Sequence, residues 1–161
     1  MKKIIGLSSV FLIIDILVKL FVKNNMLVNE SIKVIDKFFY LTYVKNTGAA
    51  WSIFSGKQTF LVIVTSIVII GLIAYLYKKK EYKKIEIIGY GLLLSGALGN
   101  LIDRILYGYV IDYLDIYIFN YNYPVFNIAD CCIVIGIVLL FISSWREEYG
   151  VYSRNRKYEN R

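Results

Sequence analysis

Residues 125–140 read VFNIADCCIVIGIVLL, and this stretch decides what kind of protein the chain forms. After Asp130 the next charged residue is Arg146, so a long apolar run begins directly behind a carboxylate. A helix needs about 20 apolar residues to span the hydrocarbon layer of a bilayer. The stretch therefore predicts a transmembrane helix over about 128–145. It also raises the question of which group pairs with Asp130, or which function the carboxylate has, at the start of that helix.

Three further apolar runs of similar length lie at 4–22, 60–77 and 85–106. The chain of 161 residues is 58% hydrophobic with a single proline, whereas soluble domains are about 45–50% apolar. Asp15 and Lys19 interrupt the first run and no small-residue cleavage site follows, so we expect a retained helix rather than a cleaved signal peptide. The sequence thus predicts an all-α polytopic membrane protein. We expect residues 1–161 to form a single integral membrane domain, with outer loops 23–59 and 107–127, a link at 78–84 and a tail at 146–161.

The net charge of +7 is unevenly distributed. Basic residues gather at the N-terminus, in the link KKKEYKK (78–84) and in the tail, while the two long loops hold few of them. Because cytoplasmic loops of membrane proteins carry the excess of Lys and Arg, both termini and the link are predicted to be cytoplasmic, and the long loops lie outside. The basic surplus is therefore a topology signal, and no nucleic-acid partner is expected. Membrane lipid is the expected surrounding, and nothing requires more than a monomer.

The sequence contains no histidine. This excludes Ser–His and Cys–His nucleophile pairs and the histidine-based zinc protease motif. In an enzyme, the general acid and base must then be carboxylates, lysine or tyrosine. The adjacent Cys131 and Cys132 seldom form a disulfide with each other and are too few for a four-cysteine zinc site. We expect them to be buried as small apolar side chains, and we expect no metal and no cofactor.

Polar residues inside or beside the predicted helices gather near the outer surface. An intramembrane charge costs about 2.5–3.5 kcal/mol on insertion scales, so such residues usually pair or line cavities. Asp15 and Lys19 are four positions apart on one helical face and can pair. The other members are Asn46 before the second helix, Asn100, Asp103 and Arg104 at the end of the third, Asp112 and Asp115 just beyond it, and Asn127 and Asp130 at the start of the fourth.

Each of these residues also has a purely structural interpretation. Asp130 is placed to cap its helix, and Arg104 is long enough to reach the lipid headgroups. Gly91, Ser95 and Gly99, spaced by four, favour close helix packing. These interpretations do not explain why so many acids lie at one level. From the residues alone, however, Asp103, Asp112 and Asp115 remain equal candidates as the partner of Asp130.

Two outer segments have a composition that differs from the helices. Residues 31–55 are rich in aromatic and β-branched types, which predicts short strands forming a small extracytoplasmic β-cradle. Within them, NTGAAW (46–51) is either a turn or a place where an extended peptide rests against exposed backbone. Residues 114–125, LDIYIFNYNYPV, are aromatic and amphipathic. They are predicted to form a loop or helix on the periplasmic side that closes over a site as a lid.

Five motifs taken together resemble those of the lipoprotein signal peptidases, also called signal peptidase II. They are DILVK (15–19), NTGAAWS (46–52), GNLIDR (99–104), VIDY (110–113) and FNIAD (126–130). Their order, spacing and placement on four helices match the family over about residues 4–145. The resemblance implies an intramembrane aspartic endopeptidase of the bacterial cytoplasmic membrane with its site near the outer face. Such an enzyme cuts the signal peptide from diacylglyceryl-modified prolipoproteins, before the lipidated lipobox cysteine.

The resemblance also implies roles for individual residues. It makes Asp112 and Asp130 the catalytic pair, without a metal or cofactor. It implies mainly structural roles for Asp15 and Lys19. The residues that it implies bind substrate or support the site are Asn46, Gly48, Ala49, Asn100, Asp103, Arg104 and Asn127.

Four positions depart from the usual family pattern. Val18 stands where the family usually has Thr or Ser, and Ile16 where Gln is common. Cys131 follows the fifth motif in place of Ser, and Lys45 precedes Asn46 in place of Arg. Lysine lacks the planar fork of arginine and makes different contacts. These changes affect supporting hydrogen bonds rather than the aspartate pair.

Overall fold

The computed structural model describes the backbone of residues 1–48, 53–119 and 121–159, and side chains up to Tyr149. The elements along the described chain are α1 (Lys2–Asn25), β1 (Ser31–Ile35), β2 (Phe39–Asn46), α2 (Gln58–Lys78), α3 (Lys84–Tyr107), β3 (Val110–Ile118), β4 (Tyr121–Asn122) and α4 (Ile128–Glu159). All 4 helices have the length and hydropathy of a membrane span, which in α4 covers Ile128–Tyr149. The predicted architecture of four spanning helices is confirmed.

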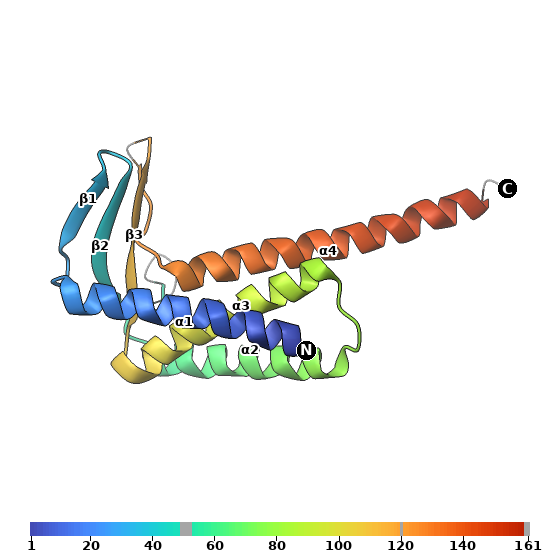
Figure 1. The fold of residues 1–161 in the computed structure, drawn as a ribbon, viewed down its shortest axis with the longest axis horizontal. Coiled ribbons are helices and arrows are strands. Elements are labelled where there is room, and N and C mark those ends of the chain that lie inside the picture. The colour runs from blue at the N-terminus through green and yellow to red at the C-terminus, as the bar shows by residue number, and fades with distance from the viewer. Residues whose placement is uncertain (49–52, 120, 160–161) are drawn as a thin grey trace.

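The helices lie side by side, with the sheet at one end and both termini at the other (Figure 1). α3 is the central helix, because 61% of its most apolar window is buried against 17–22% in the other three. The exposed apolar side chains of α1, α2 and α4 are those that face lipid in a membrane. Burial explains why α3 is the least hydrophobic of the four helices and holds several of the polar residues.

Small residues let α3 approach its neighbours closely. A Cβ added to Gly96 would collide with the carbonyl of Ala129 in α4, and one added to Gly99 would collide with the carboxylate of Asp15 in α1. Gly91 also faces α1. The packing role predicted for the small-residue ridge is therefore confirmed, and the same contacts bring polar groups of three helices together.

The sheet is antiparallel, in the order β1-β2-β3-β4, and a row of apolar residues crosses one of its faces. Directly paired residues point to the same side of a sheet. Ile32, Leu41 and Leu114 are aligned in one such row across three strands. Asp112 lies two residues before Leu114 and therefore shares its face. The predicted β-cradle is present, and Asp112 lies at the base of its apolar side.

The base of the sheet is anchored on the end of α1. Val22 and Met26 of α1 form a buried cluster with Tyr43 of β2 and with Ile111 and Tyr113 of β3. Burial of these large side chains contributes roughly 1.5–3 kcal/mol each. The cluster fixes β3, and with it Asp112, against the helix bundle.

Two segments differ from the sequence-based expectation. Residues 110–118 form a strand rather than a loop or helix, because β2 supplies a partner along most of their length. The lid predicted over 114–125 is thus in large part a component of the cradle. At the other end, α4 continues to Glu159, beyond the expected helix end at about residue 145.

Candidate active site

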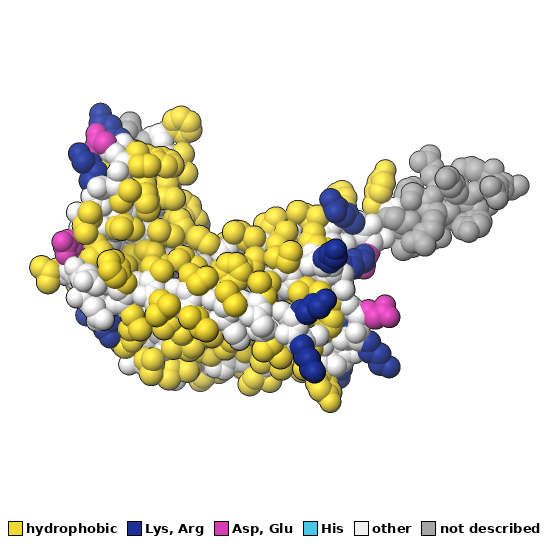
Figure 2. Space-filling model, in the orientation of Figure 1, with side chains coloured by type: hydrophobic (Ala, Val, Ile, Leu, Met, Phe, Trp, Pro, Cys, Tyr) yellow, Lys and Arg dark blue, Asp and Glu magenta, His cyan; other side chains and the backbone are white. Residues whose placement is uncertain are grey.

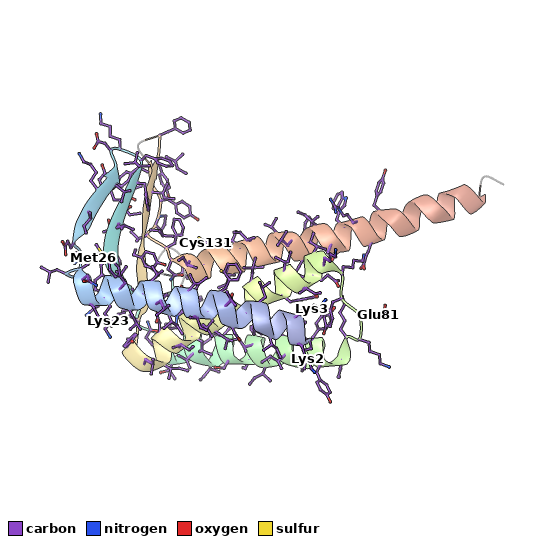
Figure 3. All side chains as sticks on the ribbon, in the orientation of Figure 1. Lys2, Lys3, Lys23, Met26, Glu81 and Cys131 are labelled. Carbon is purple, nitrogen blue, oxygen red and sulfur yellow. The ribbon has the colours of Figure 1, made fainter. Side chains whose placement is uncertain are left out.

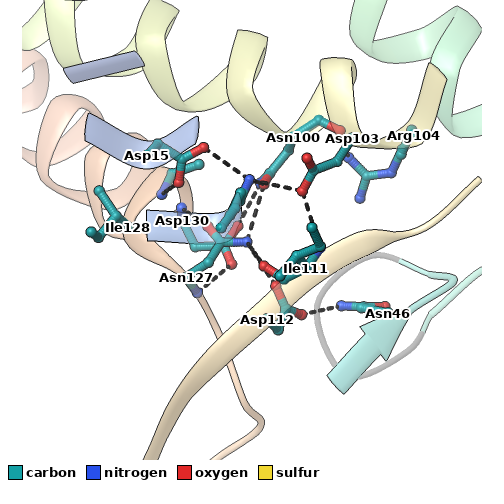
Figure 4. A network of polar contacts seen from close by, with 12 residues as sticks. Asp15, Asn46, Asn100, Asp103, Arg104, Ile111, Asp112, Asn127, Ile128 and Asp130 are labelled. Carbon is teal, nitrogen blue, oxygen red and sulfur yellow. Dashed lines mark hydrogen bonds and ion pairs between the residues drawn. The ribbon is translucent and has the colours of Figure 1, made fainter. Parts of the chain in front are cut away.

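The predicted site residues meet where β3, the sheet-side ends of α1 and α3, and the start of α4 come together (Figure 4). α1 contributes Asp15 and Lys19 and β3 contributes Asp112. α3 contributes Asn100, Asp103 and Arg104. Asn46 ends β2, and Asn127 and Asp130 stand at the start of α4.

Asp112 is almost completely buried, with 2% of its surface exposed. Its Oδ1 accepts a hydrogen bond from Nδ2 of Asn127 at 2.7 Å, and its Oδ2 accepts one from Nδ2 of Asn46 at 2.8 Å. Burial, followed by the charge of Asp130, raises the pKa of Asp112 to about 7, against the opposing effect of the two amide donors. A carboxyl group with a pKa near neutrality can hold or release a proton under physiological conditions.

Asp130 is held by the start of its own helix and by α3. Its Oδ1 accepts a hydrogen bond from Nδ2 of Asn100 at 2.7 Å, and its Oδ2 accepts one from the backbone N–H of Asn127 at 3.2 Å. In return, Oδ1 of Asn127 accepts the backbone N–H of Asp130 at 2.9 Å. This is a reciprocal capping box. Asn127, and not Asp130, is therefore the N-cap, and Asp130 occupies the third helical position.

The backbone N–H groups of Ile128 and Ala129, in the first turn of α4, are satisfied by side chains of other elements. The hydroxyl of Tyr113 accepts the N–H of Ile128 at 3.3 Å, and Oδ1 of Asp15 accepts the N–H of Ala129 at 3.0 Å. The free N–H groups at a helix start normally need such partners. Side chains from three elements thus fix the turn of helix that carries Asp130. The role of Tyr113 was not predicted from the sequence, because residues 107–127 were expected to form a loop. The strand β3, in which side chains alternate between two faces, would have indicated where Tyr113 points.

Lys19 lies at the centre of the polar cluster and is 1% exposed. Its Nζ lies 2.9 Å from Oδ2 of Asp15 and 3.1 Å from Oδ2 of Asp103, and it donates to Oδ1 of Asn100 at 3.1 Å. The pairing predicted for Asp15 and Lys19 is confirmed. Asp103 pairs with Lys19 and not with its sequence neighbour Arg104.

Arg104 extends toward the site rather than toward the lipid headgroups. Its Nη2 donates to the carbonyl of Gly48 at 3.0 Å, and the N–H of Gly48 donates to Oδ1 of Asn46 at 2.8 Å. Arg104 therefore holds the backbone that follows β2. Ala49, the next predicted site residue, lies outside the described residues.

Asp115 is separated from this network. It lies on the opposite face of β3 from Asp112, where its Oδ2 accepts a hydrogen bond from the hydroxyl of Thr42 at 2.6 Å. Asp103 is occupied by Lys19 and by the N–H of Ile111, which donates to its Oδ2 at 3.0 Å. Of the three acids that the sequence left as candidates, Asp112 is the one whose pKa is raised by the charge of Asp130, and Asn127 donates a hydrogen bond to both carboxyl groups.

Cys131 and Cys132 are both unpaired thiols, the second of them buried. Within the part of the chain that the structure describes, no three acidic or cysteine side chains come together in a way that could hold a metal ion. We therefore assign no metal ligands. The chemical groups at this site are the four carboxyl groups of Asp15, Asp103, Asp112 and Asp130, three asparagine amides, one ammonium and one guanidinium.

A family model described as signal peptidase (SPase) II matches residues 7–146 of the chain. This chain belongs to the signal peptidase II family. Two similar relatives are the lipoprotein signal peptidases of Bacillus subtilis strain 168, 44% identical over 128 residues, and of Staphylococcus aureus strain JH9, 42% identical over 146 residues. The first match covers 80% of this chain and 83% of the relative, and the second covers 88% and 90%.

Solved structures of bacterial membrane enzymes share the fold of this signal peptidase II family member. One superposes with a TM-score of 0.85 at 38% identity, covering 92% of this chain and 90% of the other. A second gives a TM-score of 0.80 at 39% identity, covering 89% and 92%. The family predicted from the five motifs is confirmed, and the chain is a bacterial membrane protein of a peptidase family.

Proposed function

We propose that this protein is an intramembrane aspartic endopeptidase that removes signal peptides from diacylglyceryl-modified prolipoproteins, cutting before the lipidated cysteine. The observation that carries the proposal is the pair Asp112 and Asp130. Both carboxyl groups are fixed by asparagine amides, and the charge of Asp130 raises the pKa of Asp112. In a member of the signal peptidase II family, such a pair is suited to activate water for peptide hydrolysis.

The two aspartates share one proton, because two neighbouring carboxylates do not both ionise readily. The raised pKa of Asp112 favours the state in which Asp112 carries this proton, and we propose that Asp130 acts as the base. Asp130 takes a proton from a water molecule, whose oxygen attacks the scissile carbonyl carbon, while Asp112 gives its proton to the carbonyl oxygen. Asp130 then passes its proton to the leaving nitrogen as the C–N bond breaks. Asp112 recovers a proton from a hydroxyl of the tetrahedral intermediate, which restores the starting state.

The asparagines and Arg104 hold this geometry during the proton transfers. Asn46 and Asn127 donate to the two oxygens of Asp112, so the carboxyl group keeps its orientation in both protonation states. Arg104 holds the carbonyl of Gly48 directly after β2, and we propose that an extended peptide contacts the backbone there. Positioning of reactive groups is among the largest contributions to enzymatic rates.

The charge distribution supports the proposed orientation in the membrane. Basic side chains gather at the end of the bundle opposite to the sheet (Figure 2), where Lys2, Lys3 and Glu81 lie (Figure 3). Met26, Lys23 and Cys131 mark the sheet end (Figure 3). By the positive-inside rule the termini are cytoplasmic, so the aspartate pair is at the outer face of the cytoplasmic membrane. A lipid-modified cysteine keeps its acyl chains in the outer leaflet, so its scissile bond would lie beside this face.

The cradle supplies an apolar wall beside the pair. Figure 2 shows a hollow between the sheet and the helices that is lined by hydrophobic side chains. Rows of apolar residues, including Leu41 and Leu114, lead along the sheet to Asp112 at its base. We propose that this wall holds the membrane-surface part of the precursor while the signal peptide lies among the helices.

The proposal is tested with purified protein in detergent micelles and a synthetic lipobox precursor, prepared with and without its diacylglyceryl group. We expect cleavage before the lipobox cysteine in the lipidated precursor alone, detected by mass spectrometry. Equal cleavage of both precursors would contradict the proposed substrate class. Full activity in D112N or D130N would contradict the catalytic pair.

A further inference from the structure

Lys19 makes more polar contacts than a single ion pair between two helices would require. A buried ammonium must use its hydrogen-bond donors, because an unpaired charge in an apolar interior costs several kcal/mol. Lys19 has three donors, and all three are used, by Asp15, Asp103 and Asn100. One acceptor lies on its own helix, and the other two lie on α3.

Each of these three acceptors makes a second contact with one of the segments that carry the aspartate pair. Asp15 accepts the N–H of Ala129, the residue before Asp130. Asp103 accepts the N–H of Ile111, the residue before Asp112. The third contact, between Nδ2 of Asn100 and Oδ1 of Asp130, reaches the carboxyl group itself. Three separate paths therefore lead from one ammonium group to the two aspartates.

We propose that Lys19 is a positioning residue of the peptidase, which sets the placement of Asp112 and Asp130 relative to each other. This inference rests on the proposed function. A purely structural Lys19 would stabilise the packing of α1 on α3 and leave the chemistry of correctly folded molecules unchanged. A positioning Lys19 changes the chemistry as well.

Lys19 contributes to the orientation of the amide of Asn100. An ammonium group only donates hydrogen bonds, so Asn100 must turn its oxygen toward Lys19 and its NH2 toward Asp130. The same oxygen accepts a hydrogen bond from Nδ2 of Asn127 at 3.1 Å, and that NH2 also donates to Asp112. Without Lys19, the oxygen of Asn100 keeps the donor on Asn127 alone, so the amide that donates to Asp130 is held by fewer contacts.

Lys19 also contributes to the electrostatic balance of Asp112. The charged groups that face Asp112 are Asp130 from α4, Lys19 from α1 and Arg104 from α3. The positive charge of Lys19 favours the ionised form of Asp112. Its removal therefore moves the pKa of Asp112 further upward, and the alkaline limb of the pH–rate profile should move in the same direction.

The test compares Lys19→Met with Lys79→Met in full-length protein purified in detergent. The matched control loses a lysine whose Nζ lies 2.6 Å from Oε1 of Glu86, at the opposite end of the bundle. Thermal unfolding measures stability, and cleavage of the lipidated precursor gives kcat, KM and the pH profile per folded molecule. We expect K19M to lower kcat roughly 10- to 100-fold with little change in KM, and to shift the alkaline limb upward. We expect K79M to lower stability alone.

A second variant covers the case in which K19M does not fold. Lys19→Met with Asp103→Asn keeps the net charge of the cluster and leaves an oxygen for the N–H of Ile111. The same loss of kcat is expected, with a smaller pH shift because a negative charge is removed together with the positive one. A wild-type kcat and pH profile in the folded double variant would overturn the proposal, as would an equal loss of kcat in K79M. Failure of the proposed function is seen separately, as full cleavage by D112N and D130N.

Discussion

The two ends of the helix bundle use charged residues in opposite ways. At the sheet end, Lys19 and Asp15 form an ion pair with side chains that are each 2% exposed. At the end that holds the termini, the pair between Lys83 and Glu147 is 51% and 53% exposed. Exposed pairs contribute about 0–1 kcal/mol, whereas loss of one partner from a buried pair costs about 3–5 kcal/mol. Charge at the sheet end fixes geometry, whereas charge at the other end is largely exposed and, in the orientation that we propose, serves to orient the chain in the membrane.

The two ends also differ in how many elements their polar contacts hold in place. The polar contacts at the sheet end connect α1, α3, α4 and β3, so a single substitution there affects several elements (Figure 4). At the other end, contacts are mostly between neighbours, such as the capping of α3 by Glu86. Substitutions at the two ends should therefore differ in kind, and not only in size.

The largest effect is expected from the aspartate pair itself. D112N and D130N keep the shape of each side chain but remove the group that carries or accepts the proton. We expect cleavage of the lipidated precursor to fall about 10²- to 10⁴-fold, the usual range for general acid–base catalysis. Thermal unfolding of each variant is the control, since a folded but inactive protein is required. An unfolded D112N and D130N would show a structural role instead.

Two substitutions of Asn127 distinguish its positioning of Asp112 from its contribution to the stability of α4. Asn127→Ser keeps a good N-cap for α4 but is too short to reach Oδ1 of Asp112, whereas Asn127→Ala loses both contacts. We expect both variants to lose most of their cleavage rate. Only the alanine variant should lose about 1–2 kcal/mol of stability from the missing cap. Wild-type activity in N127S would show that the contact with Asp112 is not needed.

The pH profile is a more subtle measure of the same site. With Asp112 as the proton donor and its pKa at about 7, activity should decline as the pH rises through about 7, because the proton is lost. Asn46→Leu removes a donor that favours the ionised form of Asp112, so the pKa rises and the decline moves to higher pH. An unchanged or lowered alkaline limb in N46L would contradict this assignment of the proton.

Much of this fold could be predicted from sequence, because its strongest signals are local. Apolar runs predicted the four spanning helices, and the four-residue spacing of Asp15 and Lys19 predicted their ion pair. The strand at 110–118 was not expected, since its partner β2 lies far away in the sequence. Without that strand, the opposite faces of Asp112 and Asp115 could not be assigned from the residues alone.

Contacts between distant residues explain the rest of what was missed. Lys19 and Asn100 are 81 positions apart, and neither side chain signals the other by spacing. From the sequence, Asp130 was placed to cap α4, but Asn is an equally good N-cap and Asn127 occupies that position. Only the position of the first helical turn shows that Asn127 is the cap and that Asp130 is free to face Asn100.

The smallest effect is expected at the exposed pair between Lys83 and Glu147, whose nitrogen and oxygen are 2.6 Å apart. Glu147→Gln removes the negative charge but leaves the α3 cap, which uses Glu86. Because both partners are half exposed, the free energy of unfolding should change by less than about 1 kcal/mol, and kcat should not change. Thermal unfolding at low and high salt measures this directly. A loss as large as that of K19M would mean that the two ends do not differ as described, since an exposed ion pair would then matter as much as a buried one.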